Sequence, residues 1–171
     1  MEILTRDAIF EDYKQIADIS IAAYQEYAKA LTKENWQKMK QSLSNVEQTA
    51  KNADYIVAEI NNKIVGAIAY YPPDKSNPKY FDSNCASLRL LAVDPNYQSR
   101  GIGKLLTQTG IDRAKRDKAK AIGLYTSAIM TAAQTMYSSL GFIRTRELPA
   151  ILGLQYYLYI LPFDGSKFSK N

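Results

Sequence analysis

The stretch at residues 98–104 has the residue types and spacing to bind an anion. It reads QSRGIGK and lies where a predicted strand passes into a predicted helix. The first N–H groups of a helix have no partner within the helix, and the helix dipole adds partial positive charge there. Gly101 and Gly103 would let a phosphate approach this backbone closely, while Arg100 and Lys104 add full charges. Taken alone, the two glycines also fit a helix start without a ligand.

Two nucleotide-binding motifs fail on spacing at this stretch. A dinucleotide-binding fingerprint requires a third glycine where the chain has Leu106. A P-loop requires glycine and Ser/Thr where the chain has Gln98 and Leu105. Both motifs are therefore excluded.

Composition narrows the chemistry further. The chain has no histidine and one cysteine, Cys85, which excludes a Cys/His zinc site, an intrachain disulfide and an imidazole base. No metal is expected. Without a histidine to lower the pKa of its thiol, Cys85 is disfavoured as a nucleophile. Acid–base chemistry would depend on carboxylates, tyrosine, lysine, the thiol or water.

Hydrophobic periodicity predicts an α/β fold, with a mixed sheet and helices on its faces. Predicted helices cover 11–27, the segment after an N-cap at Thr32, 101–118 and 130–140. Predicted strands cover 3–6, 54–60, 63–71, 86–93, 120–127, 142–147 and 154–161. Asn61-Asn62 should form a two-residue hairpin turn, and the proline-rich stretch 72–84 a surface loop.

Length and charge bound the class of protein. With 171 residues, the chain is expected to form one domain over 1–165, followed by a loose tail over 166–171. No signal peptide or membrane-spanning stretch is found, so we expect a cytoplasmic protein without a membrane partner.

The net charge of the chain is +5, and its positive charges are densest in one cluster. This cluster is expected to be a solvated helix face, and a role toward an anionic ligand is the second interpretation. Its residues are Arg113, Lys115, Arg116, Lys118 and Lys120. No nucleic-acid-reading motif accompanies the charge, so no nucleic-acid partner is expected.

Several motifs in order resemble the GCN5-related N-acetyltransferase (GNAT) family. They are Val93-Asp94-Pro95, the Q-x-R-G-x-G of 98–103, and Ala133 through Tyr137 to Gly141-Phe142. The start, with Arg6, Ala8, Asp12 and Ile16, is also similar, and the resemblance covers about residues 3–161. It implies a GNAT fold with about four helices and a splayed sheet that admits acetyl-CoA between strands 86–93 and 121–126.

The resemblance also implies site residues. The coenzyme A pyrophosphate would lie on Gln98, Ser99, Arg100, Gly101, Ile102, Gly103 and Lys104, and the pantetheine arm along the backbone of Leu91, Ala92 and Val93. The N–H of Leu91 would polarise the thioester carbonyl, which a neutral amine attacks directly. Tyr137 matches the tyrosine that protonates the leaving thiolate, although it also fits a core aromatic.

Two departures from the family pattern leave roles open. Met130 stands where many members have an asparagine that contacts the cofactor, and Gln134 is a candidate to replace it, with Ala133 on the same helix. Ser87 stands where some members have a glutamate base, so Glu59 acting through water is a candidate base, although a solvated carboxylate is the commoner reading.

The acceptor side is less defined by the sequence. Tyr24, Tyr27 and Trp36 fall where the family's helices form the acceptor lip, although each also fits the core. Arg89 is unusual in a buried strand, where it could pair with a core carboxylate, the preferred interpretation, or receive an acidic substrate group.

The sequence thus favours an acetyl-CoA-dependent N-acetyltransferase that acts on a small-molecule or peptide amine. Alternatives are acetylation of a protein N-terminus or lysine, a non-catalytic acyl-CoA sensor, and DNA binding through the basic helix. The tyrosine-rich last strand could supply a homodimer interface.

Overall fold

A computed structural model describes residues 2–163, so the tail expected over 166–171 lies outside the described residues. Seven strands form one sheet in the order β1-β2-β3-β4-β5-β7-β6. Their bounds are β1 Leu4–Asp7, β2 Asp54–Ile60, β3 Lys63–Tyr71, β4 Cys85–Val93, β5 Ala121–Ser127, β6 Ile143–Ile151 and β7 Leu154–Pro162. Among the strand pairs of the described residues, β4–β5 alone is parallel, as the mixed sheet predicted from the sequence requires.

The helices follow the predicted order with small differences at their ends. They are α1 Tyr13–Tyr24, α2 Lys33–Ser44, the one-turn α3 Val46–Thr49, α4 Ile102–Arg116 and α5 Thr131–Ser139. Helix α1 is shorter than predicted because 3-10 turns, Phe10–Asp12 and Gln25–Ala30, occupy its two ends. Thr32 caps α2 as predicted, with Oγ1 accepting the Asn35 N–H at 3.1 Å.

Side-chain alternation on the central strands places helices on both faces of the sheet. Ile56 and Ile68 share a core cluster with Ile102 and Leu106 of α4. Val57 joins the opposite cluster, which contains residues of α1. Successive residues of a strand point to opposite faces, so both faces of this part of the sheet are buried.

The hairpin is confirmed at Asn61 and Asn62, whose φ values of 50° and 63° are those of a type I′ turn. In the loop 72–84, the ring of Phe81 is buried and lies against Gly123 of β5. Strand β6 continues to Ile151, beyond the predicted end at 147, and Pro149 is tolerated because β6 is an edge strand.

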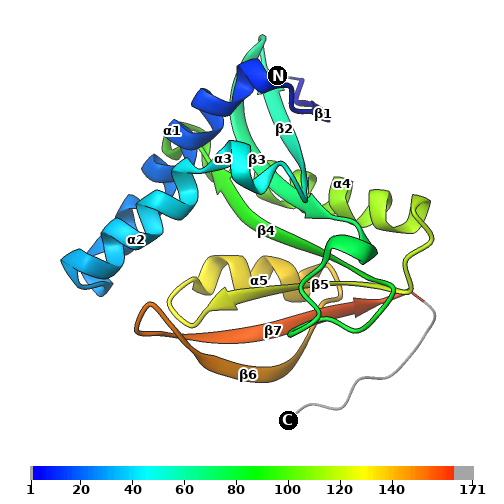
Figure 1. The fold of residues 1–171 in the computed structure, drawn as a ribbon. Coiled ribbons are helices and arrows are strands. Elements are labelled where there is room, and N and C mark those ends of the chain that lie inside the picture. The colour runs from blue at the N-terminus through cyan, green and yellow to red at the C-terminus, as the bar shows by residue number, and fades with distance from the viewer. Residues whose placement is uncertain (1, 164–171) are drawn as a thin grey trace.

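Strands β4 and β5 pair only at one end. Their register covers Cys85, Ala86 and Ser87 opposite Ala121, Ile122 and Gly123, after which the strands diverge. Figure 1 shows the resulting gap between β4 and β5, with α5 beside it. The splay that the resemblance implied between 86–93 and 121–126 is therefore present.

Strand β4 contains a β-bulge beside this gap. Ala69 pairs with Arg89 and Ala67 with Ala92, so Leu90 and Leu91 together oppose Ile68 of β3. Leu90 adopts a φ of 61°, which is unfavourable for a branched side chain. A bulge leaves an extra residue outside the strand ladder, and this one sits where the sheet splits.

The basic cluster at the end of α4 and in the segment after it is only partly exposed to solvent. Lys115, Arg116, Lys118 and Lys120 are exposed, as predicted. Arg113 is not, because it forms an ion pair with Asp7 of β1 and lies 5.8 Å over the Tyr70 ring.

Candidate functional site

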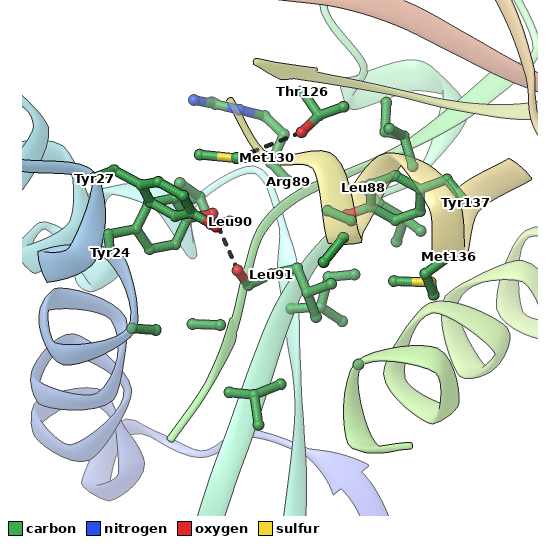
Figure 2. A pocket seen from close by; sticks show the side chains of 18 of the residues that line it. Tyr24, Tyr27, Leu88, Arg89, Leu90, Leu91, Thr126, Met130, Met136 and Tyr137 are labelled. Carbon is green, nitrogen blue, oxygen red and sulfur yellow. Dashed lines mark hydrogen bonds between the residues drawn. The ribbon is translucent and has the colours of Figure 1, made fainter. Parts of the chain in front are cut away.

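One cavity of about 550 Å³ occupies the region where the sheet splays. Its wall comes from the bulged end of β4, the start of α4, α5 and the end of α1 with the turn that follows it. Figure 2 shows Tyr24 and Tyr27 on one side of β4 and Met136 and Tyr137 on the other, so the cavity runs between the two halves of the molecule.

Backbone N–H groups line one end of the cavity. Ser99 and Gly101 have φ values of 62° and 79°, and Gly101 is the N-cap of α4 without a side-chain cap hydrogen bond. The first hydrogen bond from this cap runs from the N–H of Leu105 to the carbonyl of Gly101. The preceding N–H groups of the first turn therefore remain for an anion.

Most of the stretch 98–104 reaches the cavity. The lining includes Gln98, Ser99, Gly101, Ile102, Gly103 and Lys104. Arg100 is outside the lining, with its guanidinium 5.1 Å from the centre of the Tyr97 ring. Lys104 is therefore the side chain of this stretch that brings a full positive charge to the cavity.

The bulge exposes the backbone of β4 to the cavity. Leu91, Ala92 and Val93 all line it. The Tyr24 hydroxyl donates a hydrogen bond to the Leu91 carbonyl oxygen at 3.0 Å, as Figure 2 shows. This hydrogen bond connects α1 to the bulge. The irregular backbone of β4 therefore lies beside the cavity.

Tyr137 lies across the cavity from Tyr24. Its ring packs edge-on against Phe142 at 5.8 Å, and among the described residues no hydrogen bond involves its hydroxyl. Burial raises the pKa of Tyr137 well above its ordinary value of 10.0, with a smaller contribution from Tyr27. The phenol is thus protonated at neutral pH and free to donate.

The other predicted residues of α5 divide between the cavity and the core. Met130 and Ala133 line the cavity, and the Met130 sulfur accepts a hydrogen bond from Thr126 Oγ1 at 3.4 Å. Gln134 does not line it, because its amide nitrogen donates to the Ser127 and Ala128 carbonyls at 3.2 Å. The geometry therefore gives no support to Gln134 as a replacement for the absent asparagine.

Glu59 and Trp36 lie outside the cavity lining. Glu59 Oε1 accepts hydrogen bonds from the Arg6 Nε and Nη2 at 2.9 Å and 2.7 Å, so its carboxylate is held at the far edge of the sheet. Trp36 is 9% exposed and packs in a cluster with Met39 and Leu43. Neither position supports the role expected from the sequence.

Glu26 is the carboxylate that sequence reasoning missed. Of the described residues that line the cavity, it alone carries a carboxyl group, and it lies beside Tyr27. Its position in a 3-10 turn beyond α1 gave no periodic signal that it would face a site.

Arg89 also lines the cavity, and the preferred interpretation of it is wrong. No salt bridge between described residues involves Arg89, so it does not pair with a core carboxylate. Its guanidinium lies 5.6 Å from the centre of the Tyr125 ring instead.

Cys85 is buried away from the cavity at the closed end of the β4–β5 pair. Burial raises the pKa of its thiol to about 12, with Asp82 adding to the effect. The thiol is therefore protonated at neutral pH, which agrees with the sequence analysis, where Cys85 is disfavoured as a nucleophile.

The chain belongs to the acetyltransferase (GNAT) family, whose model matches residues 13–142. It is 33% identical to N-acetylaspartate synthetase of Danio rerio over 91 residues, which are 53% of this chain and 30% of that protein. It is 31% identical to the probable N-acetyltransferase camello of Xenopus tropicalis over 105 residues, which are 60% of this chain and 45% of that protein. The chain thus spans less than half the length of these relatives.

Solved structures share the fold. The PaiA N-acetyltransferase of Thermoplasma acidophilum, solved with coenzyme A, superposes with a TM-score of 0.76 at 17% identity, covering 95% of this chain and 100% of that one. YncA of Salmonella typhimurium, solved with acetyl-CoA, gives 0.68 at 19% identity, covering 96% and 95%. Within residues 2–163, no helix is long and apolar enough to cross a membrane.

Proposed function

We propose that this protein transfers an acetyl group from acetyl-CoA to a primary amine of a small molecule or peptide. The observation that carries the proposal is a single cavity that joins the uncapped start of α4 to the bulge at Leu91 and to the Tyr137 hydroxyl. An anion cradle, a free strand edge and a proton donor are the three features that binding and cleaving a coenzyme A thioester require.

The chain would bind coenzyme A along this cavity. The N–H groups of the first turn of α4 and the charge of Lys104 hold the pyrophosphate. The edge of β4 at Ala92 and Val93 pairs with the amides of the pantetheine arm, because β5 has diverged and no longer occupies that edge. The acetyl thioester then lies between the bulge and Tyr137.

The reaction is a direct attack of the amine nitrogen on the thioester carbonyl carbon. The N–H of Leu91 donates a hydrogen bond to the carbonyl oxygen, where negative charge develops as the C–N bond forms. When the C–S bond breaks, Tyr137 donates its proton to the departing sulfur. The amine nitrogen gives up one proton to a base, Tyr137 regains one proton from solvent, and the amide and the free thiol are the products.

Glu26 replaces Glu59 as the proposed proton acceptor. It is the carboxylate of the described cavity lining and lies on the same 3-10 turn as Tyr27. Figure 2 shows Tyr27 on the side of the cavity opposite Tyr137. From this turn Glu26 can attract an ammonium group and take up the proton, directly or through water.

The experiment is a panel of amines assayed for free thiol released from acetyl-CoA. The panel covers amino acids, polyamines, aromatic amines and peptides with a free N-terminus or lysine. Thiol release that depends on an amine, with the acetylated product seen by mass spectrometry, is the expected result. Acetyl-CoA binding without thiol release from any amine would instead favour the non-catalytic sensor.

A further inference from the structure

The Arg89 side chain is a cation without a carboxylate partner in the wall of the cavity. Arg89 is half-buried on β4, and its surroundings are phenols: the groups that act on its charge are Tyr125, Tyr71 and Tyr55. A guanidinium remains charged at all ordinary pH values, and removing it from water is costly without an anion. The Tyr125 ring at 5.6 Å offsets only part of that cost.

Strand β4 also fixes where Arg89 lies relative to the reaction. Along the strand, Val93 is nearest the 98–104 stretch, Leu91 lies at the bulge, and Arg89 lies beyond it. A coenzyme A molecule that runs from the α4 cradle to Leu91 therefore ends before Arg89. Figure 2 shows the Arg89 side chain extending toward the side of Tyr24 and Tyr27 and away from Tyr137.

The cavity thus holds two cations at its two ends. Lys104 lies at the cradle, and Arg89 lies beyond the bulge; no other lysine or arginine is in the described lining. The first suits the phosphates of the cofactor. Among the described residues the second faces phenols, with Tyr71 as a side-chain hydrogen-bond partner, but forms no salt bridge with a carboxylate. It also lies beyond the proposed position of the cofactor, so the anion left to meet it belongs to the acceptor.

We infer that Arg89 binds a carboxylate of the acceptor, so that the substrate is an amine that also carries a carboxylate, such as an amino acid or a peptide with an acidic residue. The inference rests on the proposed function. A guanidinium presents two parallel N–H donors to a carboxylate, a geometry that fixes the acceptor's orientation as well as its charge. The acceptor's amine then lies toward Glu26 and the thioester.

The test compares acceptors that differ only in the carboxylate. Aspartate is paired with asparagine, glutamate with glutamine, and several amino acids with their C-terminal amides, each assayed with wild-type protein and Arg89→Met. Methionine keeps an unbranched apolar stem against Tyr125. Because an amide also lowers the pKa of the neighbouring amine, the quantity compared is the variant-to-wild-type ratio of kcat/KM for each acceptor.

We expect Arg89→Met to lower kcat/KM by about 10- to 100-fold for the preferred carboxylate-bearing acceptor, as loss of a charge-assisted pair does. For the amide that lacks the carboxylate bound by Arg89, the change should stay within about twofold. Arg89→Lys should restore part of the loss because it keeps the charge. The control Arg116→Gln removes one exposed charge outside the cavity and should leave both ratios near one.

An equal loss for the acid and its amide would overturn the inference and make Arg89 a structural residue, while leaving the proposed function intact. Absence of thiol release from every acceptor would overturn the proposed function instead. In that case, calorimetric titration of aspartate, glutamate and their amides onto coenzyme A-bound protein decides the inference: equal binding of acid and amide contradicts it, and Arg89-dependent binding of the acid supports it.

Discussion

At the scale of single residues, Tyr137 combines a free hydroxyl with a raised pKa. We expect Tyr137→Phe to lower the rate of thiol release by about 100-fold where the chemical step limits the rate, because the thiolate loses its proton donor. Stability should change little, since no described hydrogen bond involves this hydroxyl. Stopped-flow thiol detection gives the rate, and thermal melts the stability.

The direction of the pKa shift also predicts the alkaline limb of the pH profile. An acid is active below its pKa, and burial raises that of Tyr137 above 10.0. The wild-type rate should therefore not fall through loss of this proton anywhere below about pH 10. An alkaline limb near pH 8 that disappears in Tyr137→Phe would contradict the raised pKa, because Tyr137 would then lose its proton well below pH 10.

Glu26 and Glu59 allow a matched comparison of two candidate bases. Glu26 lines the cavity, whereas Glu59 is held by Arg6 outside it. Glu26→Gln should reduce kcat/KM at pH 7 by about tenfold or more, because a positioned base is lost. Glu59→Gln should leave turnover of the folded protein unchanged. The reverse order of effects in the thiol-release assay would restore Glu59 as the base.

At the scale of elements, the start of α4 depends differently on its two glycines. Gly101 has a φ of 79°, so Gly101→Ala places a Cβ in the left-handed region at a cost of about 1–2 kcal/mol. Its Tm should fall by about 2–8 °C, and coenzyme A should bind more weakly because the first-turn N–H groups shift.

Gly103 is the control for this effect. A Cβ there would meet Leu91, Val93 and Met136 at 3.7–3.9 Å, which is ordinary contact, and its φ is not positive. Gly103→Ala should keep or raise the Tm. Equal damage from both substitutions, measured by melting and by calorimetry, would show that space rather than backbone conformation matters at this turn.

The first strand is joined to α1 and β2 by one arginine. Arg6 bonds Asp12 at 2.7 Å and 3.1 Å as well as Glu59, and Asp12 also accepts the Ile9 N–H at 2.8 Å. The Arg6 hydrogen bond lowers the pKa of Asp12 below 3.8, opposed in part by burial. The resulting stability is present above pH 3.8 and is lost as the pH falls through the folded-state pKa.

Asp12→Asn should therefore reduce the free energy of unfolding at pH 7 by about 1–2 kcal/mol, with solvent around the half-exposed Arg6 limiting the effect. The difference from wild type should shrink below the ordinary pKa of the carboxyl. Asp18→Asn, which breaks an exposed pair with Lys14, should cost less than about 0.5 kcal/mol. Urea unfolding between pH 3 and 7 measures both, and a difference independent of pH would rule out this ion pair as the cause.

The elements that sequence predicts well here are those fixed by local chemistry. Thr32 caps a helix through its own hydroxyl, and Asn61-Asn62 supplies the positive φ of its own turn. The bulge at Leu90 could not be read in this way, because it arises from the register of β4 against β3. Nothing in leucine predicts a φ of 61°.

In the candidate site, too, local motifs can be predicted from the sequence, whereas contacts between distant residues cannot. The resemblance to the GNAT family implies roles for the stretch 98–104 and for Tyr137, and most of that stretch lines one cavity together with Tyr137. The partners of Glu59 and Arg89 were not predictable, because Arg6 lies 53 residues from Glu59 and, within residues 2–163, no salt bridge involves Arg89. Long-range packing decides which charges are paired and which remain for a ligand.

At the scale of the whole molecule, the sheet has two halves that meet at few backbone pairs. In the part of the chain that the structure describes, the strand register between β1–β4 and β5–β7 covers Cys85–Ser87 and Ala121–Gly123, and the cavity wall draws on both halves. Figure 1 shows α1 and α2 attached to the first half and α5 to the second. A ligand that fills the cavity contacts both halves and should resist their separation.

Acetyl-CoA should therefore raise the Tm of the whole chain. At free ligand near 100 times Kd the gain is about 2.7 kcal/mol. For a chain of this size, that gain corresponds to a Tm increase on the order of 5–10 °C. Pantetheine and adenosine 3′,5′-bisphosphate each contain one part of the ligand and should give smaller shifts, even when added together, because neither joins the cradle to the bulge. Differential scanning fluorimetry at several ligand concentrations measures these shifts in Tm. If millimolar acetyl-CoA produced no shift, the proposal of cofactor binding would be contradicted. The enzyme and the sensor interpretations would then both be wrong.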